Sequence, residues 1–221
     1  MADQIIQGSP EWFAIRCGKV TASRVADVIA RTKTGWGASR ANYAAELVAE
    51  RLTGVLAEGF KSAAMQWGSD NEADARAAYA WLRDAEVEEV GFVPHHSIAD
   101  TGASPDGLVG PDGLVEIKCP STATHIETLL DQSIPAKYIT QMQWQMACTG
   151  AKWCDFVSYD PRMPEEMRLF VKRVERDQGR IEELEAEVVT FLAEVRATVA
   201  ELTRIYRPAK PSDFLHPIMA G

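Results

Sequence analysis

The sequence has few cysteines and no long apolar run. Its cysteines are Cys17, Cys119, Cys148 and Cys154, and none forms a C-x-x-C pair. Neither a zinc ribbon nor a cysteine-bound iron–sulfur cluster is therefore expected, and the thiols are expected to be free in a reducing cytoplasm. No run of about 18 apolar residues occurs, so we expect no membrane-spanning helix. The N-terminus lacks a basic start followed by an apolar stretch, so no signal peptide is expected.

An excess of basic residues is also missing. The 221 residues include 23 Lys or Arg and 32 Asp or Glu, which gives a net charge of −9. This balance argues against a simple coat protein for nucleic acid. Repeats, low-complexity segments and long linkers are absent, and 46% of the residues are hydrophobic. The sequence thus predicts one globular domain over residues 1–221.

Apolar spacing and turn residues predict both helices and strands. Helices are expected at residues 10–16, 21–30 and 41–53, and a further helix of about twelve residues is expected to begin at Ser69. Two amphipathic helices are expected at residues 137–148 and 177–206. Strands are expected at residues 87–93, 95–99, 152–158 and 168–174, and on both sides of a turn at 110–113. Residues 207–221 are rich in proline and predict an irregular tail. The order indicates a mixed α/β (α+β) fold, with a central mixed β-sheet flanked by helices.

Two carboxylates and a lysine lie near this turn. A strand places Glu116 and Lys118 on one face, about 7 Å apart, and Val115 and Ile117 on the other. Asp106 lies across the turn. Such a set suits metal-assisted phosphodiester hydrolysis, because carboxylates bind a hard divalent ion that polarises phosphate and acidifies a bound water. The alternative is an exposed Glu–Lys pair on a surface hairpin, which contributes little.

The length of the turn decides whether the two carboxylates share a face. A four-residue turn at 110–113 sets Asp106 opposite Ile117, on the wrong face for a joint site with Glu116. A turn with an odd number of residues, or a bulge, brings Asp106 to the required face. The sequence leaves both arrangements open.

A family resemblance rests on several motifs in order. The segment from Ser104 to Gly107, followed by Glu116-Ile-Lys118, resembles the PD-(D/E)XK nuclease signature. The match to phage recombination exonucleases of the lambda exonuclease type runs from about residue 8 to about residue 175. Its further blocks are Trp12-x-x-x-Arg16-x-Gly18, residues 20–23, Trp67-Gly68-x-x-x-Glu72-x-x-Ala75-Arg76, Tyr138-x-x-Gln141-x-Gln143, Thr149 and residues 159–163.

This resemblance implies a restriction-endonuclease-like core and a specific activity. The activity is 5′→3′ degradation of one strand of linear double-stranded DNA from 5′-phosphorylated ends, which leaves 3′ single strands for annealing recombination. The resemblance also implies Mg²⁺, for which Mn²⁺ should substitute, and a homotrimeric ring around the DNA. It further implies a phage single-strand annealing protein as partner, no membrane association, and work in the cytoplasm of a bacterial host.

The catalytic residues follow from the same resemblance. Asp106 and Glu116 match metal ligands, with the Ile117 carbonyl as a third oxygen. Lys118 matches the residue that holds the attacking water. Gln141 matches a residue that orients the lysine or the water, although an exposed polar position on an amphipathic helix is the alternative for it.

Glu72 matches a helix carboxylate that completes the metal site or carries a second ion. Ser69 and Glu72 also have the spacing of a helix capping box, so a structural role competes with the catalytic one. Three carboxylates in contact would repel one another strongly without a cation. A bound metal ion would therefore explain why three carboxylates lie together, and the three carboxylates would provide its ligands.

DNA contacts are the last set that the resemblance implies. Arg16 and Ser23 match a 5′-phosphate pocket, in which a guanidinium fork and a helix N-terminus at 21–23 that includes Thr21 would bind the anion. Ser23 as a plain helix cap is the alternative. Lys33 matches a basic residue that enters the minor groove, where this family has arginine. Met65 matches an apolar wedge that parts the end base pairs, or else a core methionine.

Two other functions remain as hypotheses. A PD-(D/E)XK endonuclease or repair nuclease would have no need of a 5′-phosphate pocket built on Arg16 and Ser23. A catalytically silent DNA-end clamp that recruits an annealing protein would have no need of the intact set of Asp106, Glu116 and Lys118.

Overall fold

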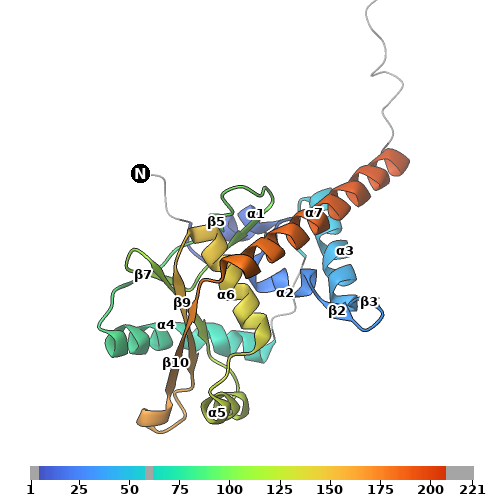
Figure 1. Cartoon of the computed structure of the whole chain (residues 1–221). Helices are drawn as coiled ribbons and strands as arrows, with labels where there is room; N and C mark the ends of the chain where they lie inside the picture. The colour runs from blue at the N-terminus through green and yellow to red at the C-terminus, as the bar shows by residue number, and fades with distance from the viewer. Residues whose placement is uncertain (1–4, 58–61, 208–221) are drawn as a thin grey trace, which may run out of the picture.

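The computed structural model describes residues 5–57 and 62–207, in which helices surround a twisted central sheet (Figure 1). Residues 208–221, nearly all of the expected irregular tail, lie outside the described residues. The described helices are α1 (Pro10–Arg16), η1 (Ala22–Arg24), α2 (Val25–Val28), α3 (Ala38–Thr53), α4 (Ala63–Arg83), α5 (Thr122–Asp131), α6 (Ala136–Thr149), η2 (Glu165–Met167) and α7 (Gln178–Tyr206). Within this part of the chain, no helix is long and apolar enough to cross a membrane.

The main sheet has five strands in the order β10-β9-β8-β7-β4. The β8–β9 pair is parallel, and the other pairs are antiparallel. Its strands are β4 (Val87–Glu88), β7 (Gly107–Val109), β8 (Gly113–Lys118), β9 (Trp153–Tyr159) and β10 (Leu169–Glu175). A smaller sheet and a hairpin contain β1 (Val20–Thr21), β5 (Val93–Pro94), β6 (Thr101–Ala103), β2 (Arg31–Thr32) and β3 (Gly35–Trp36). The mixed α/β fold with a central mixed sheet is confirmed.

Two long helices pack on opposite faces of the main sheet. Side chains from α4 join Val115 and Ile117 of β8 in one apolar cluster. Side chains from α6 join Leu114 of β8 and Phe156 of β9 in another. The alternation along β8 therefore places the even-numbered side chains, Glu116 among them, toward α6. The predicted apolar face of this strand is confirmed.

A third apolar cluster joins the N-terminal elements to the last helix. Phe191 and Leu184 of α7 are fully buried against Tyr43 and Leu47 of α3 and Val25 of α2. The C-terminal end of α7 extends away from the rest of the molecule (Figure 1). The predicted helices at 10–16, 41–53 and 177–206 are confirmed, and Gly54 ends α3 in a left-handed conformation with φ 71°.

Several predicted elements differ from the structure. The helix expected from Ser69 begins at Ala63, where the Ser62 side chain accepts a hydrogen bond from Met65 N. The Ser69 hydroxyl instead donates to Met65 O inside the helix, so the capping-box interpretation of Glu72 is wrong. The helix expected at 21–30 is a short strand, one 3-10 turn and the four-residue α2. The strand expected at 87–93 is reduced to β4 at 87–88 and the first residue of β5 at 93–94, and residues 95–99, where a second strand is expected, contain none.

Candidate active site

A three-residue turn brings the two predicted strand carboxylates to one face of the sheet. Val109 pairs with Gly113 and Gly107 pairs with Val115, so residues 110–112 form the turn. Because the turn has an odd number of residues, the side chains face the opposite way from those after a four-residue turn. The same register, extended by one residue, places Asp106 opposite Glu116. The Asp106 Oδ2 atom accepts a hydrogen bond of 2.6 Å from Ile117 N, which fixes the carboxylate beside β8.

The Glu116 side chain is fully buried, and side-chain donors hold both of its oxygens. Oε1 accepts from Gln141 Nε2 at 2.6 Å and lies 2.5 Å from Lys118 Nζ. Oε2 accepts from Gln145 Nε2 at 2.5 Å. These contacts exclude the alternative of an exposed surface pair, because a carboxylate enters the interior only with such partners.

The two glutamines lie one turn apart on α6 and face the same carboxylate. The helix expected at 137–148 is confirmed as α6, but its residues 140–148 are all buried, so its expected amphipathic character and the exposed position considered for Gln141 are wrong. Gln145 was missed by the sequence analysis. Its spacing of four residues from Gln141 places both side chains on one face of a helix, and this spacing could have identified it. Gln143 lies between them, so the segment looked merely rich in glutamine.

Glu72 approaches the same cluster from α4, and Arg76 holds it there. The Arg76 guanidinium donates from Nη2 to Glu72 Oε1 at 2.7 Å and from Nε to the Asp106 carbonyl at 3.1 Å. Its Nη1 forms an ion pair of 3.0 Å with Glu89. Arg76 thus joins α4 to the segment before β7, a role that its place in the sequence did not reveal.

The charges of the cluster perturb one another. Burial, together with the nearby Glu116 carboxylate, raises the pKa of Asp106 well above its usual value. Burial also raises the pKa of Glu72, which Arg76 and Lys118 partly oppose. Burial lowers the pKa of Lys118, but the carboxylates of Glu116 and Asp106 raise it by more, so Lys118 stays protonated. Repulsion among three carboxylates is typical of a site that binds a cation.

A second group of predicted residues lines one cavity of about 280 Å³. Arg16, Thr21, Ser23 and Met65 all border it. The Arg16 guanidinium carbon lies 3.7 Å from the centroid of the Trp12 ring, and burial lowers the pKa of Arg16 to about 10. Arg16 therefore stays a cation at neutral pH, and the Glu50 carboxylate, which lines the same cavity, attracts it and partly opposes this lowering of its pKa.

The other predicted DNA contacts differ in their surroundings. The Thr21 and Ser23 hydroxyls lie 3.4 Å apart, but the helix N-terminus expected there is only a three-residue turn. Met65 is 59% exposed in the first turn of α4, so the alternative of a core methionine is wrong. Lys33 is exposed in the turn between β2 and β3 and lies in neither the carboxylate cluster nor this cavity.

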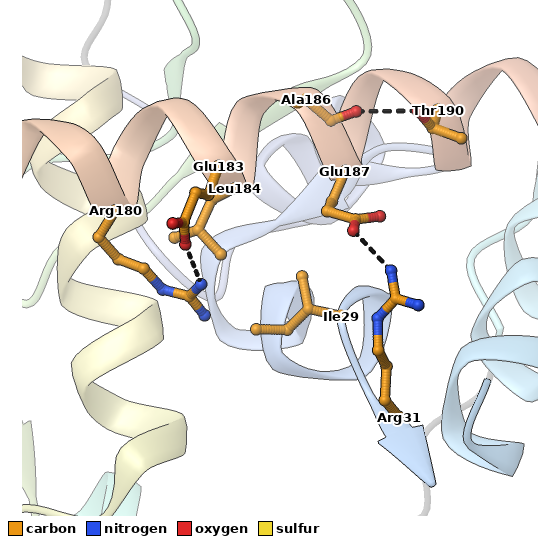
Figure 2. A pocket seen from close by; sticks show the side chains of 8 residues that line it. All are labelled: Ile29, Arg31, Arg180, Glu183, Leu184, Ala186, Glu187 and Thr190. Carbon is orange, nitrogen blue, oxygen red and sulfur yellow. Dashed lines mark hydrogen bonds and ion pairs between the residues drawn. The ribbon is translucent and has the colours of Figure 1, made fainter. Parts of the chain in front are cut away.

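Another cavity, of about 570 Å³, lies along α7 and contains none of the predicted residues (Figure 2). Ile29 and Leu184 form its apolar part. The ion pairs Arg31–Glu187 and Arg180–Glu183 border it, at 2.8 Å each. Its charged side chains are paired with one another, so it offers no cluster of reactive groups.

The fold and the site together define a class of protein. One carboxylate just before a strand, a second on the adjacent strand and a lysine two residues after the second, on a mixed sheet between helices, are the arrangement of the PD-(D/E)XK nuclease fold. Residues 11–152 match the model of the YqaJ-like viral recombinase domain. The chain belongs to the YqaJ-like viral recombinase family.

Solved structures agree with this assignment. An alkaline exonuclease (LHK-Exo) from Laribacter hongkongensis is 54% identical, with a TM-score of 0.85 over 90% of this chain and 98% of that chain. Its complex with dAMP matches equally well. A phage related exonuclease from Haemophilus somnus 129PT, 17% identical, shares the fold with a TM-score of 0.68 over 83% of this chain and 96% of that chain. No curated protein sequence matches this chain. The resemblance to lambda exonuclease-type proteins is confirmed at the level of the family.

Proposed function

We propose that this protein is a metal-dependent 5′→3′ exonuclease that shortens one strand of linear double-stranded DNA from 5′-phosphorylated ends. The 3′ single strands that it leaves would serve single-strand annealing recombination. The observation that carries the proposal is the cluster of Asp106, Glu116 and Lys118 on one hairpin, together with a cavity lined by Arg16. Family membership and the exonuclease relative support it.

The donor set fits a divalent ion with oxygen ligands. Asp106, Glu116 and the Ile117 carbonyl would hold Mg²⁺, and Glu72 would complete the site or carry a second ion. Within the described residues, no three His, Cys, Asp or Glu side chains converge on one metal position. Mg²⁺ or Mn²⁺ would therefore take Asp106 and Glu116 directly and keep several waters, as Mg²⁺ commonly does, and Glu72 would complete the site through one of these waters. When bound, the ion would polarise the phosphate and lower the pKa of a bound water.

The remaining residues of the cluster would orient the reactants. Gln141 and Gln145 fix the Glu116 carboxylate from the side of α6, so that it cannot rotate away. The Lys118 ammonium, 2.5 Å from Glu116, would hold the attacking water and stabilise charge that develops on the phosphate. Each of these groups sits on a regular helix or strand, which favours a fixed geometry.

The cavity beside Arg16 would bind the terminal 5′-phosphate. Its planar guanidinium stacks on Trp12, which leaves the donor groups at its edge to make bonds with phosphate oxygens. The hydroxyls of Thr21 and Ser23 line the same cavity and would donate further hydrogen bonds. Holding the end of the strand in this way would set both the direction and the register of cleavage.

Further expectations belong to the same proposal. Lys33 would approach the minor groove, and the exposed Met65 would part the end base pairs. A homotrimeric ring would keep the duplex enclosed between cleavage steps, which explains how a chain of net charge −9 retains DNA. A single-strand annealing protein would receive the 3′ strand, in the cytoplasm of the bacterial host.

The test compares a linear 5′-phosphorylated duplex with a closed circular duplex in Mg²⁺ and in Mn²⁺. The proposal predicts loss of the linear DNA from 5′ ends, an intact circle, and no hydrolysis by Lys118→Ala. Cleavage of the circle would instead favour an endonuclease or repair nuclease. Retained end binding without hydrolysis in either metal would favour a silent end clamp.

A further inference from the structure

The indole of Trp12 contacts both halves of the proposed site. Its face carries the Arg16 guanidinium, one helical turn away on α1, with 3.7 Å between the guanidinium carbon and the ring centroid. Its Nε1–H donates a hydrogen bond of 3.0 Å to Ser104 Oγ. Ser104 lies two residues before Asp106, so one rigid ring spans from the cavity of Arg16 to the segment that carries a proposed metal ligand.

The segment that Trp12 reaches is held at three successive residues by other parts of the chain. Besides the Trp12 bond to Ser104, Gln7 Nε2 donates to the Pro105 carbonyl at 2.8 Å. Arg76 Nε donates to the Asp106 carbonyl at 3.1 Å. Gln7 and Arg76 fix the backbone of this segment, whereas Trp12 alone among these three also contacts Arg16.

We propose that Trp12 is a positioning residue that sets the distance between Arg16 and Asp106, and with it the length of the fragment removed in each step. The inference rests on the proposed function. An indole has two side-chain torsions and here has contacts on its face and at its edge, so it acts as a spacer of fixed length. A small shift of the reacting phosphodiester relative to the metal ligands reduces the rate strongly.

The test is Trp12→Phe, which keeps an aromatic face for Arg16 and removes the donor to Ser104. We expect kcat on 5′-phosphorylated duplex in Mg²⁺ to fall about tenfold, with KM changed by less than about twofold. We also expect dinucleotides among the products, where the wild type releases mononucleotides. A role in folding alone would lower the melting temperature without changing the length of the products.

Ser104→Ala provides a second variant in which Trp12 is intact. It should give the same change in kcat and in product length, and the double variant should be no worse than either single one, because both remove the same bond. The matched control is Trp153→Phe. Its ring also carries an arginine, Arg173 at 3.5 Å, but it pairs with Gly113 at the far end of β8 from Lys118. This control should keep the wild-type products.

The outcomes separate the two claims. If the wild type prefers 5′-phosphate ends and releases mononucleotides while Trp12→Phe does the same at an unchanged kcat, the inference is wrong. Additive losses in the double variant, or a loss in Ser104→Ala alone, also overturn it. If the wild type shows no digestion from 5′-phosphate ends, the proposed function fails and the inference fails with it.

Discussion

The Asp106 carboxylate accepts a 2.6 Å hydrogen bond from the backbone N–H of Ile117, across the β7–β8 hairpin. This bond joins a residue just before one strand to the residue between Glu116 and Lys118 on the next strand. It places the two carboxylates on one face and leaves Ile117 in the apolar cluster beneath α4. The hairpin therefore assembles most of the cluster by its register alone.

The glutamine pair on α6 should control the affinity for metal. Replacing Gln145 with Leu leaves Glu116 Oε2 without its donor, so the carboxylate can turn from the position in which we propose that it binds the metal ion. We expect about a tenfold rise in the Mg²⁺ concentration that gives half the maximal rate. A titration of the initial rate with Mg²⁺ measures this shift.

Gln143→Leu is the matched control for this prediction. Gln143 is equally buried, but it bonds the Glu175 carbonyl and Asp177 N instead of Glu116. Both variants should lose thermal stability, and only Gln145→Leu should change the Mg²⁺ requirement. An equal shift in both would show that helix packing, and not the bond to Glu116, governs metal affinity.

Magnesium should stabilise the fold more at high pH than at low pH. The folded-state pKa values of Asp106 and Glu72 lie above their usual values, so the folded protein holds these protons more tightly than the unfolded chain. The stability that this provides at low pH is lost as pH rises through the raised pKa values, where a cation can replace the protons.

Melting curves with and without Mg²⁺ at about pH 8 and about pH 5 test this prediction. The increase in melting temperature should be larger at the higher pH and should largely disappear in Asp106→Asn. An increase of equal size at both pH values, or one that Asp106→Asn retains, would place the bound ion elsewhere on the protein.

Arg16 should confer the preference for a 5′-phosphate. Arg16→Ala removes the guanidinium of the cavity, and we expect kcat/KM on phosphorylated ends to fall about 10- to 100-fold. Arg16→Lys should recover part of it, because lysine keeps the charge and lacks the planar fork. Rates on 5′-hydroxyl ends should stay near those of the wild type.

A control for Arg16 is Arg180→Ala, which removes an arginine from the other cavity (Figure 2). It should keep the phosphate preference. Loss of the preference in Arg180→Ala, or its retention in Arg16→Ala, would contradict the assignment of the phosphate pocket.

Asp160 should contribute to stability in mild acid. Its carboxylate accepts two side-chain bonds from Arg162, at 2.7 and 3.0 Å. Burial raises the pKa of Asp160, but bonds from Arg162 and Thr122 lower it by more, to about 2. The stabilisation is complete above the usual pKa of 3.8 and is lost as pH falls toward 2. Urea unfolding across this range should show a weaker dependence on pH in Asp160→Asn than in the wild type.

Much of this fold can be predicted from the sequence, because the spacing of apolar residues and the turn residues depend on local structure. The alternation along residues 114–118 predicts which side chains face the core, and Gly54 predicts the end of α3. The start of α4 was missed because Ser69 and Glu72 imitate a cap, while the true cap is Ser62. Local patterns do not reveal which of two possible starts the tertiary contacts select.

The site is predictable to the extent that its residues lie in motifs. Asp106, Glu116 and Lys118 lie within thirteen residues of the sequence. Arg76 and Trp12 instead reach Asp106 and Ser104 from other elements. These contacts span 30 and 92 residues, and only the packing of the helices on the sheet brings them together. The number of residues in the turn at 110–112 likewise depends on the register of the hairpin.

The most direct test of the account uses a linear duplex with a 5′-phosphate on one strand and a 5′-hydroxyl on the other. Wild type and Lys118→Ala are compared in Mg²⁺, with the two strands labelled separately and the folding of both proteins checked by circular dichroism. The account predicts mononucleotides from the 5′ end of the phosphorylated strand, and none from the folded variant. Digestion from 3′ ends, equal loss of both strands, or full activity in Lys118→Ala would contradict it.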